Sequence, residues 1–227
     1  FENGVSMLSS QQYEVLQALS TPLLADARVR LGLLESHLDP GIRPVVPFTR
    51  MVGTAVTVRL EMAPDKSSGD LSLLRDTYAS QAPGSFSIIV IQVPEQLHRY
   101  GIVGEGAATH ARIHGIGGAL IEGAARDSHD LRDMEFPVFC RSISPGSIVG
   151  KATAVASNEP VIVGGRTIHS GDIVMGDNDG VLIVPREELG DVIDRAEAIK
   201  QWEHRVISAI AAGQPSNKAL SDAGPMP

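Results

Sequence analysis

The stretch from Ser87 to Val93 constrains the fold most, because four consecutive residues in it, Ile88 to Ile91, are large and apolar. Neighbouring side chains of a strand point to opposite faces, so a strand of this kind is buried on both sides. Such strands are typical of parallel sheets in α/β proteins. Pro83 and Gly84 supply a turn just before the stretch. We therefore predict an α/β fold with a fully buried strand at 87–93.

The segments next to this strand are expected to form a βαβ-like middle third. Residues 52–58 alternate as a strand does, and residues 70–81 and 105–114 have helical spacing. Residues 119–122 and 137–140 have strand character. Parallel strands need crossover connections, which are nearly always right-handed, so these helices are expected to join parallel strands.

Capping signals at the N-terminal end of the chain predict two helices. Ser9 and Gln12 have the spacing of a capping box, which predicts a short helix there. Thr21 and Pro22 are expected to cap and open a second helix, and Gly32 is expected to end it in the left-handed conformation.

The last third of the chain changes from short strands to one long helix. Apolar runs between residues 153 and 184 are separated by glycine-rich turns, which predicts antiparallel hairpins or a barrel-like sheet. A helix is expected over 187–212, with Gly213 at its end. The tail 214–227 has few apolar residues and is expected to be mobile. The whole chain, 1–227, is interpreted as one α/β domain with its core at about 15–213.

Charge and cysteine content exclude several classes of function. The net charge of −8 repels phosphate backbones and anionic lipid, so neither nucleic acid nor a membrane surface is expected as a partner. No apolar run approaches the ~20 residues that a membrane helix needs. Cys140 is the single cysteine, which is compatible with a reducing compartment, and the cytoplasm is the expected location. A buried, unreactive thiol is the favoured interpretation of Cys140.

A glycine-containing loop and an Arg-Asp pair carry the strongest functional signal. The loop opens the helix at 105–114, and it consists of Gly104, Glu105, Gly106 and Ala107. Main-chain N–H groups at a helix start bind anions, and glycine permits close approach of a ligand. Arg126 and Asp127 follow a predicted strand, with twenty residues between Glu105 and Arg126. Ligands of open α/β sheets bind at the carboxyl ends of strands.

These groups together predict a site for a small acid. The guanidinium of Arg126 offers a planar fork for a carboxylate or an enolate oxygen, and Asp127 offers a hard oxygen ligand for Mg²⁺ or Mn²⁺. The alternative is an ordinary surface ion pair beside a glycine turn. Another candidate is a zinc pair at His110 and His114, which have i, i+4 spacing, although partly exposed helix histidines are the favoured interpretation.

Two further segments have ordinary structural explanations beside functional ones. Residues 177–180 have the composition of the start of a Ca²⁺ loop, but they lie between strands, so a hairpin turn is favoured. Trp202 is expected either to anchor a contact between subunits or simply to pack within its own domain.

The spacing Glu105-x20-Arg126-Asp127 resembles the D/E-x20-R-D signature of a known family. That family contains class II 4-hydroxy-4-methyl-2-oxoglutarate/4-carboxy-4-hydroxy-2-oxoadipate aldolases and the RraA-like proteins. The resemblance extends over about residues 15–213, and it includes segments 20–27, 52–58 and 171–185.

This resemblance implies a swivelling β/β/α fold that assembles as homotrimers or homohexamers, with the site between subunits. It implies that the loop from Gly104 to Ala107 holds the carboxylate of a pyruvyl group through main-chain amides, and that Arg126 contacts pyruvate. It also implies that Asp127 binds a divalent metal, expected to be Mg²⁺, with Glu105 bound through water. A glutamate from a neighbouring subunit would complete the site, either Glu203 or, as the second choice, Glu197.

The function implied is a metal-dependent lyase that cleaves 4-hydroxy-2-oxo acids by retro-aldol to pyruvate and a second 2-oxo acid. Oxaloacetate decarboxylation is expected at the same site, because it passes through the same enolate. Gly106 and Ala107 are smaller than the residues often found there, and Glu122 replaces a frequent aspartate, so the leaving half of the substrate stays open. The alternatives are a non-catalytic regulator that binds a ribonuclease or another protein, and a lyase for a different hydroxy or sugar acid.

Overall fold

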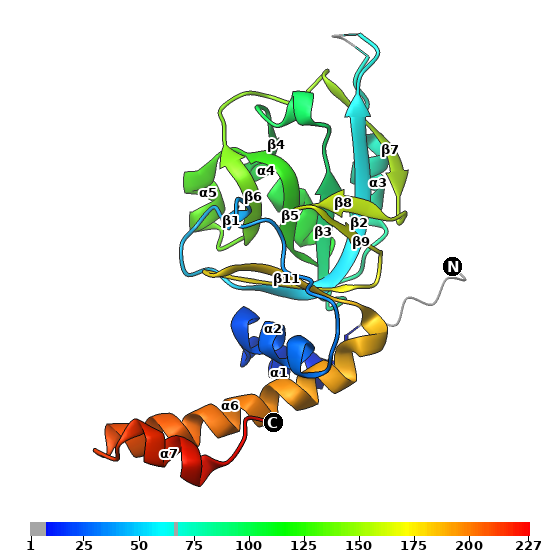
Figure 1. Ribbon diagram of the computed structural model, residues 1–227. Coiled ribbons are helices and arrows are strands. Elements are labelled where there is room, and N and C mark those ends of the chain that lie inside the picture. Colours follow the sequence, from blue (N-terminus) through cyan, green and yellow to red (C-terminus); the bar gives the residue numbers. More distant parts are fainter. Residues whose placement is uncertain (1–7, 66–67) are drawn as a thin grey trace.

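A strongly curved mixed sheet forms the centre of the computed structural model, which describes residues 8–65 and 68–227 (Figure 1). Its strands follow the order β1-β6-β5-β3-β2-β10-β11, with β4 beside β5 and β7 beside β2. The strands are β1 (Arg43–Pro44), β2 (Met51–Met62), β3 (Ser87–Gln92), β4 (Gly101–Val103), β5 (Ile116–Ala125), β6 (Val138–Ile143), β7 (Ala152–Ser157), β10 (Ile173–Asp177) and β11 (Gly180–Val184).

The middle of the sheet is parallel, as the sequence predicts. Strand β3 pairs in parallel with β2 and with β5, and β5 pairs in parallel with β6. Strands β7 and β10 pair with β2 in antiparallel orientation. The sheet curls until its two end strands, β1 and β11, nearly meet. The chain just before β1 bonds to β11 there, since the amide of Leu38 donates to the carbonyl of Val181 at 2.9 Å. The predicted α/β fold is therefore confirmed, and the structure adds that its mixed sheet is nearly closed.

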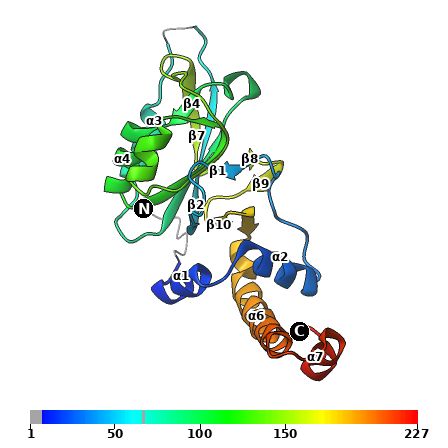
Figure 2. The ribbon, with the colours of Figure 1, turned by 90° about the vertical axis from the view of Figure 1, so that its left-hand side faces the viewer.

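Both faces of β3 are buried, as its apolar sequence requires. Ile89 and Ile91 pack toward the three helices α3 (Ser72–Ala79), α4 (Glu105–Ile113) and α5 (Ser128–Asp133), which follow β2, β4 and β5. Ile88 and Val90 pack on the inner side, where the hairpin of β8 (Val161–Val163) and β9 (Arg166–Ile168) lies. Figure 2 shows α3 and α4 on one side of the sheet and β8 and β9 on the other.

A third layer of helices covers β2, β10 and β11 at the lower end of the sheet in Figure 1. This layer contains α1 (Ser10–Gln17), α2 (Thr21–Arg30) and α6 (Leu189–Ala211). Short 3-10 turns lie elsewhere in the chain order: η1 (Glu95–Leu97) precedes β4, and η2 (Arg186–Glu188) precedes α6. The capping box of Ser9 and Gln12 and the left-handed Gly32 are confirmed. Among the helices described, none has both the length and the apolar character that crossing a membrane requires.

The C-terminal segment differs from the mobile tail expected for 214–227, because it forms helix α7 (Ser216–Ala223). Gly213, with φ +90°, ends α6 and turns the chain back along it. Ala219 is buried against Trp202 and Val206 of α6, and the indole Nε1 of Trp202 donates to the carbonyl of Gly224 at 2.9 Å. The low apolar content of this segment suffices because α6 supplies the large side chains of the contact.

The start of α2 also differs in detail from the sequence-based prediction. Ser20, rather than Thr21, is the N-cap, and its hydroxyl accepts from the amide of Leu23. Thr21 instead donates from its main-chain N and its Oγ1 to the buried carboxylate of Asp177, at 2.8 and 2.7 Å. Asp177 starts the tight β10–β11 turn and also accepts from the amide of Asp179 at 3.0 Å, so the predicted hairpin turn is confirmed. Thr21 therefore ties α2 to the sheet.

Replacing Thr21 by valine removes a hydroxyl donor from a buried carboxylate while keeping the branched shape of the side chain. We expect the free energy of unfolding to fall by about 1.5 to 3 kcal/mol, the range for hydrogen bonds to charged groups. Urea denaturation followed by circular dichroism measures the change. The matched control is Thr109→Val on the exposed surface of α4, which is expected to change stability by less than about 0.5 kcal/mol. Equal effects at the two positions would contradict this account.

Candidate functional site

Arg126 and Asp127 lie where β5 ends, beside the end of β4. The amide of Arg126 donates to the carbonyl of Val103 in β4 at 2.9 Å, which fixes the two strand ends together. Asp127 has a left-handed backbone (φ 51°, ψ 44°) and is the N-cap of α5. This backbone is uncommon for residues other than glycine, and Asp and Asn adopt it more readily than most. The chain therefore turns sharply at Asp127 and exposes its carboxylate at the carboxyl edge of the sheet.

The Asp127 carboxylate brings the two sequence motifs together. Its Oδ2 accepts from the main-chain N of Glu105 at 3.1 Å, at the first residue of α4. Both of its oxygens lie 3.2 Å from Nε of Arg126. The side chains of Arg126 and Asp127 are 38% and 30% exposed, so both can still reach a ligand. The predicted convergence of Glu105, Arg126 and Asp127 at one edge is observed.

Two glycines leave the space that these side chains occupy. A Cβ atom at Gly104 would lie 2.3 Å from Oδ2 of Asp127, and a Cβ at Gly101 would lie 2.6 Å from Cβ of Arg126. Both distances are far below van der Waals contact. Gly104 is therefore required for close approach of Asp127 to the start of α4, whereas a Cβ at Gly106 would meet open space.

The first turn of α4 presents main-chain donors to the same region. The amides of Gly106 and Ala107 have no hydrogen-bond partner among residues 8–65 and 68–227, as is usual for the first turn of a helix. The side chain of Glu105 is exposed at this turn, and Gly106 is exposed too. Nη1 and Nη2 of Arg126 are likewise unpaired within the described part of the chain. These donors can bind a carboxylate, and the helix N-terminus favours it electrostatically.

The two glutamates expected from the C-terminal helix do not join this site within one chain. Glu203 is partly buried and Glu197 is exposed, both on α6. Helix α6 packs against α2, α7 and η2 and extends away from the sheet at the end opposite to α4 and α5 (Figures 1 and 2). A second chain would be needed to bring either glutamate to Asp127.

The carboxylates at this edge have the chemistry that a magnesium ion requires. Mg²⁺ takes oxygen ligands and usually keeps several waters beside one or two carboxylates. Asp127 is a partly exposed carboxylate, and Glu105 places a second one at the start of α4. Within the described residues, no group of three or more His, Cys, Asp or Glu side chains is arranged to hold a metal. A metal at Asp127 would therefore take its remaining ligands from water, substrate or another chain.

His110 and His114 form an aromatic cluster. Their ring centroids are 4.9 Å apart and edge to face, and the His110 ring lies 5.6 Å from that of the buried Tyr78. Burial raises the pKa of Tyr78, because the charged form is desolvated. The arrangement is that of helix histidines packed on a core tyrosine, in line with the favoured interpretation.

Cys140 is buried, as expected. Its Sγ lies 3.1 Å from the carbonyl oxygen of Ser142, to which the thiol donates. Burial raises the pKa of the Cys140 thiol, which disfavours the reactive thiolate. The residue therefore has a packing role.

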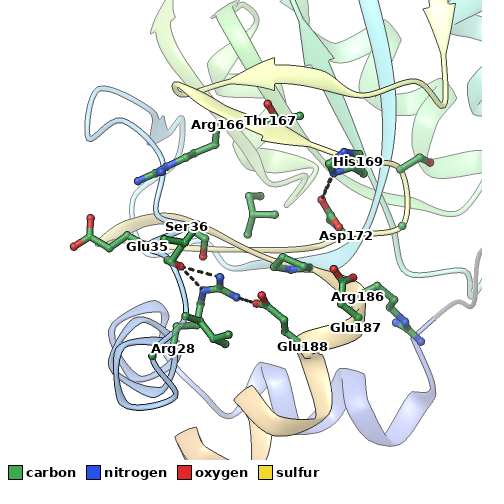
Figure 3. Close-up of a pocket in the computed structure, with 17 residues that line it drawn as sticks. Arg28, Glu35, Ser36, Arg166, Thr167, His169, Asp172, Arg186, Glu187 and Glu188 are labelled. Carbon is green, nitrogen blue, oxygen red and sulfur yellow. Dashed lines mark hydrogen bonds and ion pairs between the residues drawn. The ribbon is translucent and has the colours of Figure 1, made fainter.

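A separate cleft of about 880 Å³ lies between the sheet and the helix layer, and it contains none of the predicted site residues (Figure 3). We call it the basal cleft. It is lined by residues of three segments, within 28–36, 166–172 and 183–188. No sequence pattern points to this cleft, because the three segments are far apart in the chain and share no motif.

A buried arginine and a buried aspartate shape the basal cleft. Arg28 forms an ion pair with Glu188 and donates from Nη2 to the carbonyl of Leu34 at 2.8 Å. Asp172 accepts from the amide of His169 at 2.8 Å, and its Oδ2 lies 3.6 Å from Nδ1 of His169. Burial raises the pKa of Asp172, and nearby Glu187 adds to this rise, while the contacts with His169 oppose it.

Fold and site together define a class: an α/β domain with a nearly closed sheet, whose carboxyl edge presents an arginine, an aspartate and free main-chain amides. The model of the family described as RraA-like, Aldolase/RraA, matches residues 21–183. The chain belongs to this family.

Relatives of known sequence span most of the chain. An uncharacterised protein of Methanocaldococcus jannaschii is 29% identical over 219 residues, which cover 96% of this chain and 97% of that protein. A protein of Halalkalibacterium halodurans with the name "Putative 4-hydroxy-4-methyl-2-oxoglutarate aldolase" is 32% identical over 71% of this chain and 72% of its own length. Protein DlpA of Legionella pneumophila is 32% identical over 80% of this chain, and the match spans 29% of DlpA.

Solved structures share the fold. An uncharacterised protein from Pseudomonas syringae superposes with a TM-score of 0.79 at 29% identity, covering 94% of this chain and 98% of that one. RraAS2 of Streptomyces coelicolor, described as an unusual member of the RNase ES inhibitor RraA protein family, gives 0.76 at 22% identity, covering 88% and 96%. This second likeness supports the fold alone.

The two glycines at the start of α4 provide a matched test of the site geometry. We expect Gly104→Ala to lower the free energy of unfolding by about 1 to 3 kcal/mol, because its Cβ would displace the Asp127 carboxylate. Gly106→Ala has open space and improves helix propensity, so it is expected to be neutral or to stabilise by up to about 1 kcal/mol. Urea titration compares them. A Gly104→Ala protein as stable as Gly106→Ala would show that the close approach is unimportant.

Proposed function

We propose that this protein is a divalent-metal-dependent lyase that cleaves 4-hydroxy-2-oxo acids by a retro-aldol reaction. The products would be pyruvate and a second 2-oxo acid, as for 4-hydroxy-4-methyl-2-oxoglutarate. The same site would decarboxylate oxaloacetate. The observation that carries the proposal is the convergence of Arg126, Asp127 and the free amides of α4 at one sheet edge. The name of the Halalkalibacterium relative supports the same reaction class.

The pyruvyl end of the substrate would bind to the first turn of α4. The amides of Gly106 and Ala107, with Gly104 leaving room beside them, would donate to the substrate carboxylate. The terminal nitrogens of Arg126 would donate to the keto oxygen. Since Nε of Arg126 is held by Asp127, the guanidinium plane is fixed before substrate arrives.

Asp127 would hold the metal directly, with Glu105 bound to it through water. A divalent cation there would act as a Lewis acid that polarises the keto oxygen. Asp127 is oriented for this role by the amide of Glu105 and by Arg126. Mg²⁺ is the ion proposed, with Mn²⁺ as the alternative, because both prefer oxygen ligands.

Arg126 would supply the main stabilisation of the developing charge. When the bond between C3 and C4 breaks, the electron pair moves toward the C2 oxygen, and the guanidinium would face that oxygen throughout. The C4 hydroxyl must lose its proton in the same step. The exposed carboxylate of Glu105 is the acceptor proposed for this proton, through a water molecule. Oxaloacetate decarboxylation needs no such acceptor.

Helix α6 has features that favour a second copy of the chain as the source of Glu203. Ile207 and Ile210 are 63% and 40% exposed. Ile207 lies four residues after Glu203, and Ile210 lies three residues after Ile207, so all three share one face of the helix. An apolar stripe on a projecting helix is stabilised when another surface covers it. We propose a homotrimer or homohexamer in which this face of α6 contacts a neighbouring chain and adds Glu203 to its Asp127 site. The free, buried Cys140 fits a reducing compartment, and we propose the cytoplasm.

Pyruvate release from a panel of substrates tests the lyase. We expect release from 4-hydroxy-4-methyl-2-oxoglutarate and from oxaloacetate with Mg²⁺, and none with EDTA. Arg126→Ala is expected to lower kcat/KM for both substrates by about a hundredfold or more, since it removes a transition-state donor. Asp127→Asn should do the same while keeping the fold, because Asn tolerates the left-handed backbone.

Three outcomes would contradict the proposal in different ways. Absence of metal-dependent pyruvate from every substrate would favour a non-catalytic protein that binds a ribonuclease or another protein. Metal-dependent cleavage of only other hydroxy or sugar acids would favour a different lyase on this scaffold. Loss of one activity with retention of the other in Arg126→Ala would show that the two reactions do not share a site.

Complementation between variants tests the source of the glutamate. Arg126→Ala and Glu203→Ala are each expected to be inactive, and refolding them together should restore part of the activity, since some mixed sites would contain both native residues. The matched control is Glu197→Ala, which is expected to be active on its own and so to need no complementation by Arg126→Ala. That result would show that Glu197 is dispensable. If the Arg126 and Glu203 variants fail to complement, while Glu203→Ala is inactive and folded, the shared site is wrong.

A further inference from the structure

Opposite charges occupy opposite ends of the basal cleft. Arg166 lies at one end, and Asp172 with His169 and Glu187 lies at the other (Figure 3). Nε of Arg166 donates to the carbonyl of His37 at 3.3 Å, while its two terminal nitrogens have no hydrogen-bond partner among the described residues. The carboxylate of Glu187 likewise makes no hydrogen bond or ion pair within that part of the chain. The cleft thus offers an unpaired cation and an unpaired anion.

The remaining charged groups at the cleft do not change this polarity. Arg28 and Glu188 neutralise each other in an ion pair. The side chains of Glu35 and Arg186 point away from the cleft in the close-up view (Figure 3). Arg166 is therefore the cation at one end of the cleft, where its side chain extends toward the rim (Figure 3), and Asp172 and Glu187 are the anions at the other end.

The walls of the basal cleft are held in place before any ligand binds. Arg28, with 3% of its surface exposed, joins two of the three wall segments: it forms an ion pair with Glu188 and donates to the carbonyl of Leu34 in its own segment. The turn that carries Asp172 is closed by the amide of His169. A preformed cleft loses little conformational entropy on binding.

Apolar and hydroxyl groups complete the lining. Ile183 and Pro185 contribute aliphatic surface, and Thr167 contributes a hydroxyl. Oγ of Ser36 is buried and has no hydrogen-bond partner among the residues described. An unpaired buried hydroxyl is unfavourable, and a polar ligand would satisfy it.

We propose that the basal cleft binds a small zwitterion, a molecule that carries one carboxylate and one ammonium group, such as an amino acid. Its carboxylate would pair with the fork of Arg166, and its ammonium group would lie between Asp172 and Glu187. A cation there relieves the repulsion between these two carboxylates. A 2-oxo acid lacks the ammonium group and leaves the Asp172 end unmatched, so this site differs from the proposed lyase site.

Isothermal titration calorimetry on the full chain tests the zwitterion site. The probes are L-alanine, β-alanine and 4-aminobutanoate, which differ in the separation of their charges. Butanoate and butylamine are the matched probes that carry one charge each. We expect one or more zwitterions to bind with a Kd of about 1 mM or lower, and both single-charge probes to bind at least about tenfold more weakly. No binding by any zwitterion, or equal binding of butanoate, overturns the proposal.

Variants at both ends of the cleft locate the site. Arg166→Gln and Glu187→Gln change partly or fully exposed residues, and each is expected to weaken zwitterion binding by about tenfold or more. Arg132→Gln, on the exposed surface of α5, is the matched control and should bind as the native protein does. Asp127→Asn should also keep zwitterion binding, which separates this proposal from the lyase. Native affinity in both cleft variants would contradict it.

Discussion

The hydrogen bonds of the Asp127 carboxylate organise the upper end of this structure. One side chain connects the end of β5, the first amide of α4 and the guanidinium of Arg126. The left-handed backbone at Asp127 costs of the order of 1 kcal/mol or more, and these contacts offset it. They also explain why Gly104 has no side chain, since any Cβ would occupy the position of the carboxylate. With the first amide of α4 used by Asp127, the next two stay available for a ligand.

Much of the fold follows from local sequence pattern. The run Ile88–Ile91 requires burial on both faces, and the structure supplies helices on one side and the β8–β9 hairpin on the other. The Ser9 capping box and Gly32 are short-range signals, and both appear as predicted. The site edge was predictable for a related reason, because residues that follow parallel strands meet at one edge whatever the details of packing.

The features that sequence analysis missed depend on partners far away in the chain. Thr21 is a reasonable N-cap by local rules, but Asp177, 156 residues away, takes both of its donors. Helix α7 forms on the large side chains of α6, which its own composition does not reveal. The basal cleft has the same origin, since the buried Arg28 pairs with Glu188, 160 residues further along the chain. The role proposed for Glu203 is a further case, because it would need a surface of a second chain, which no pattern within one chain describes.

The central claim is that Arg126 and Asp127 form a single metal-dependent site for a pyruvate-like acid. Calorimetric titration with oxalate, which mimics the planar enolate of pyruvate, tests it most directly. We predict one oxalate bound per chain in the presence of Mg²⁺, no binding without a divalent ion, and loss of binding in Arg126→Ala. Oxalate binding that is independent of metal, or that persists in Arg126→Ala but disappears in Arg166→Gln, would contradict the account and move the acid site to the basal cleft.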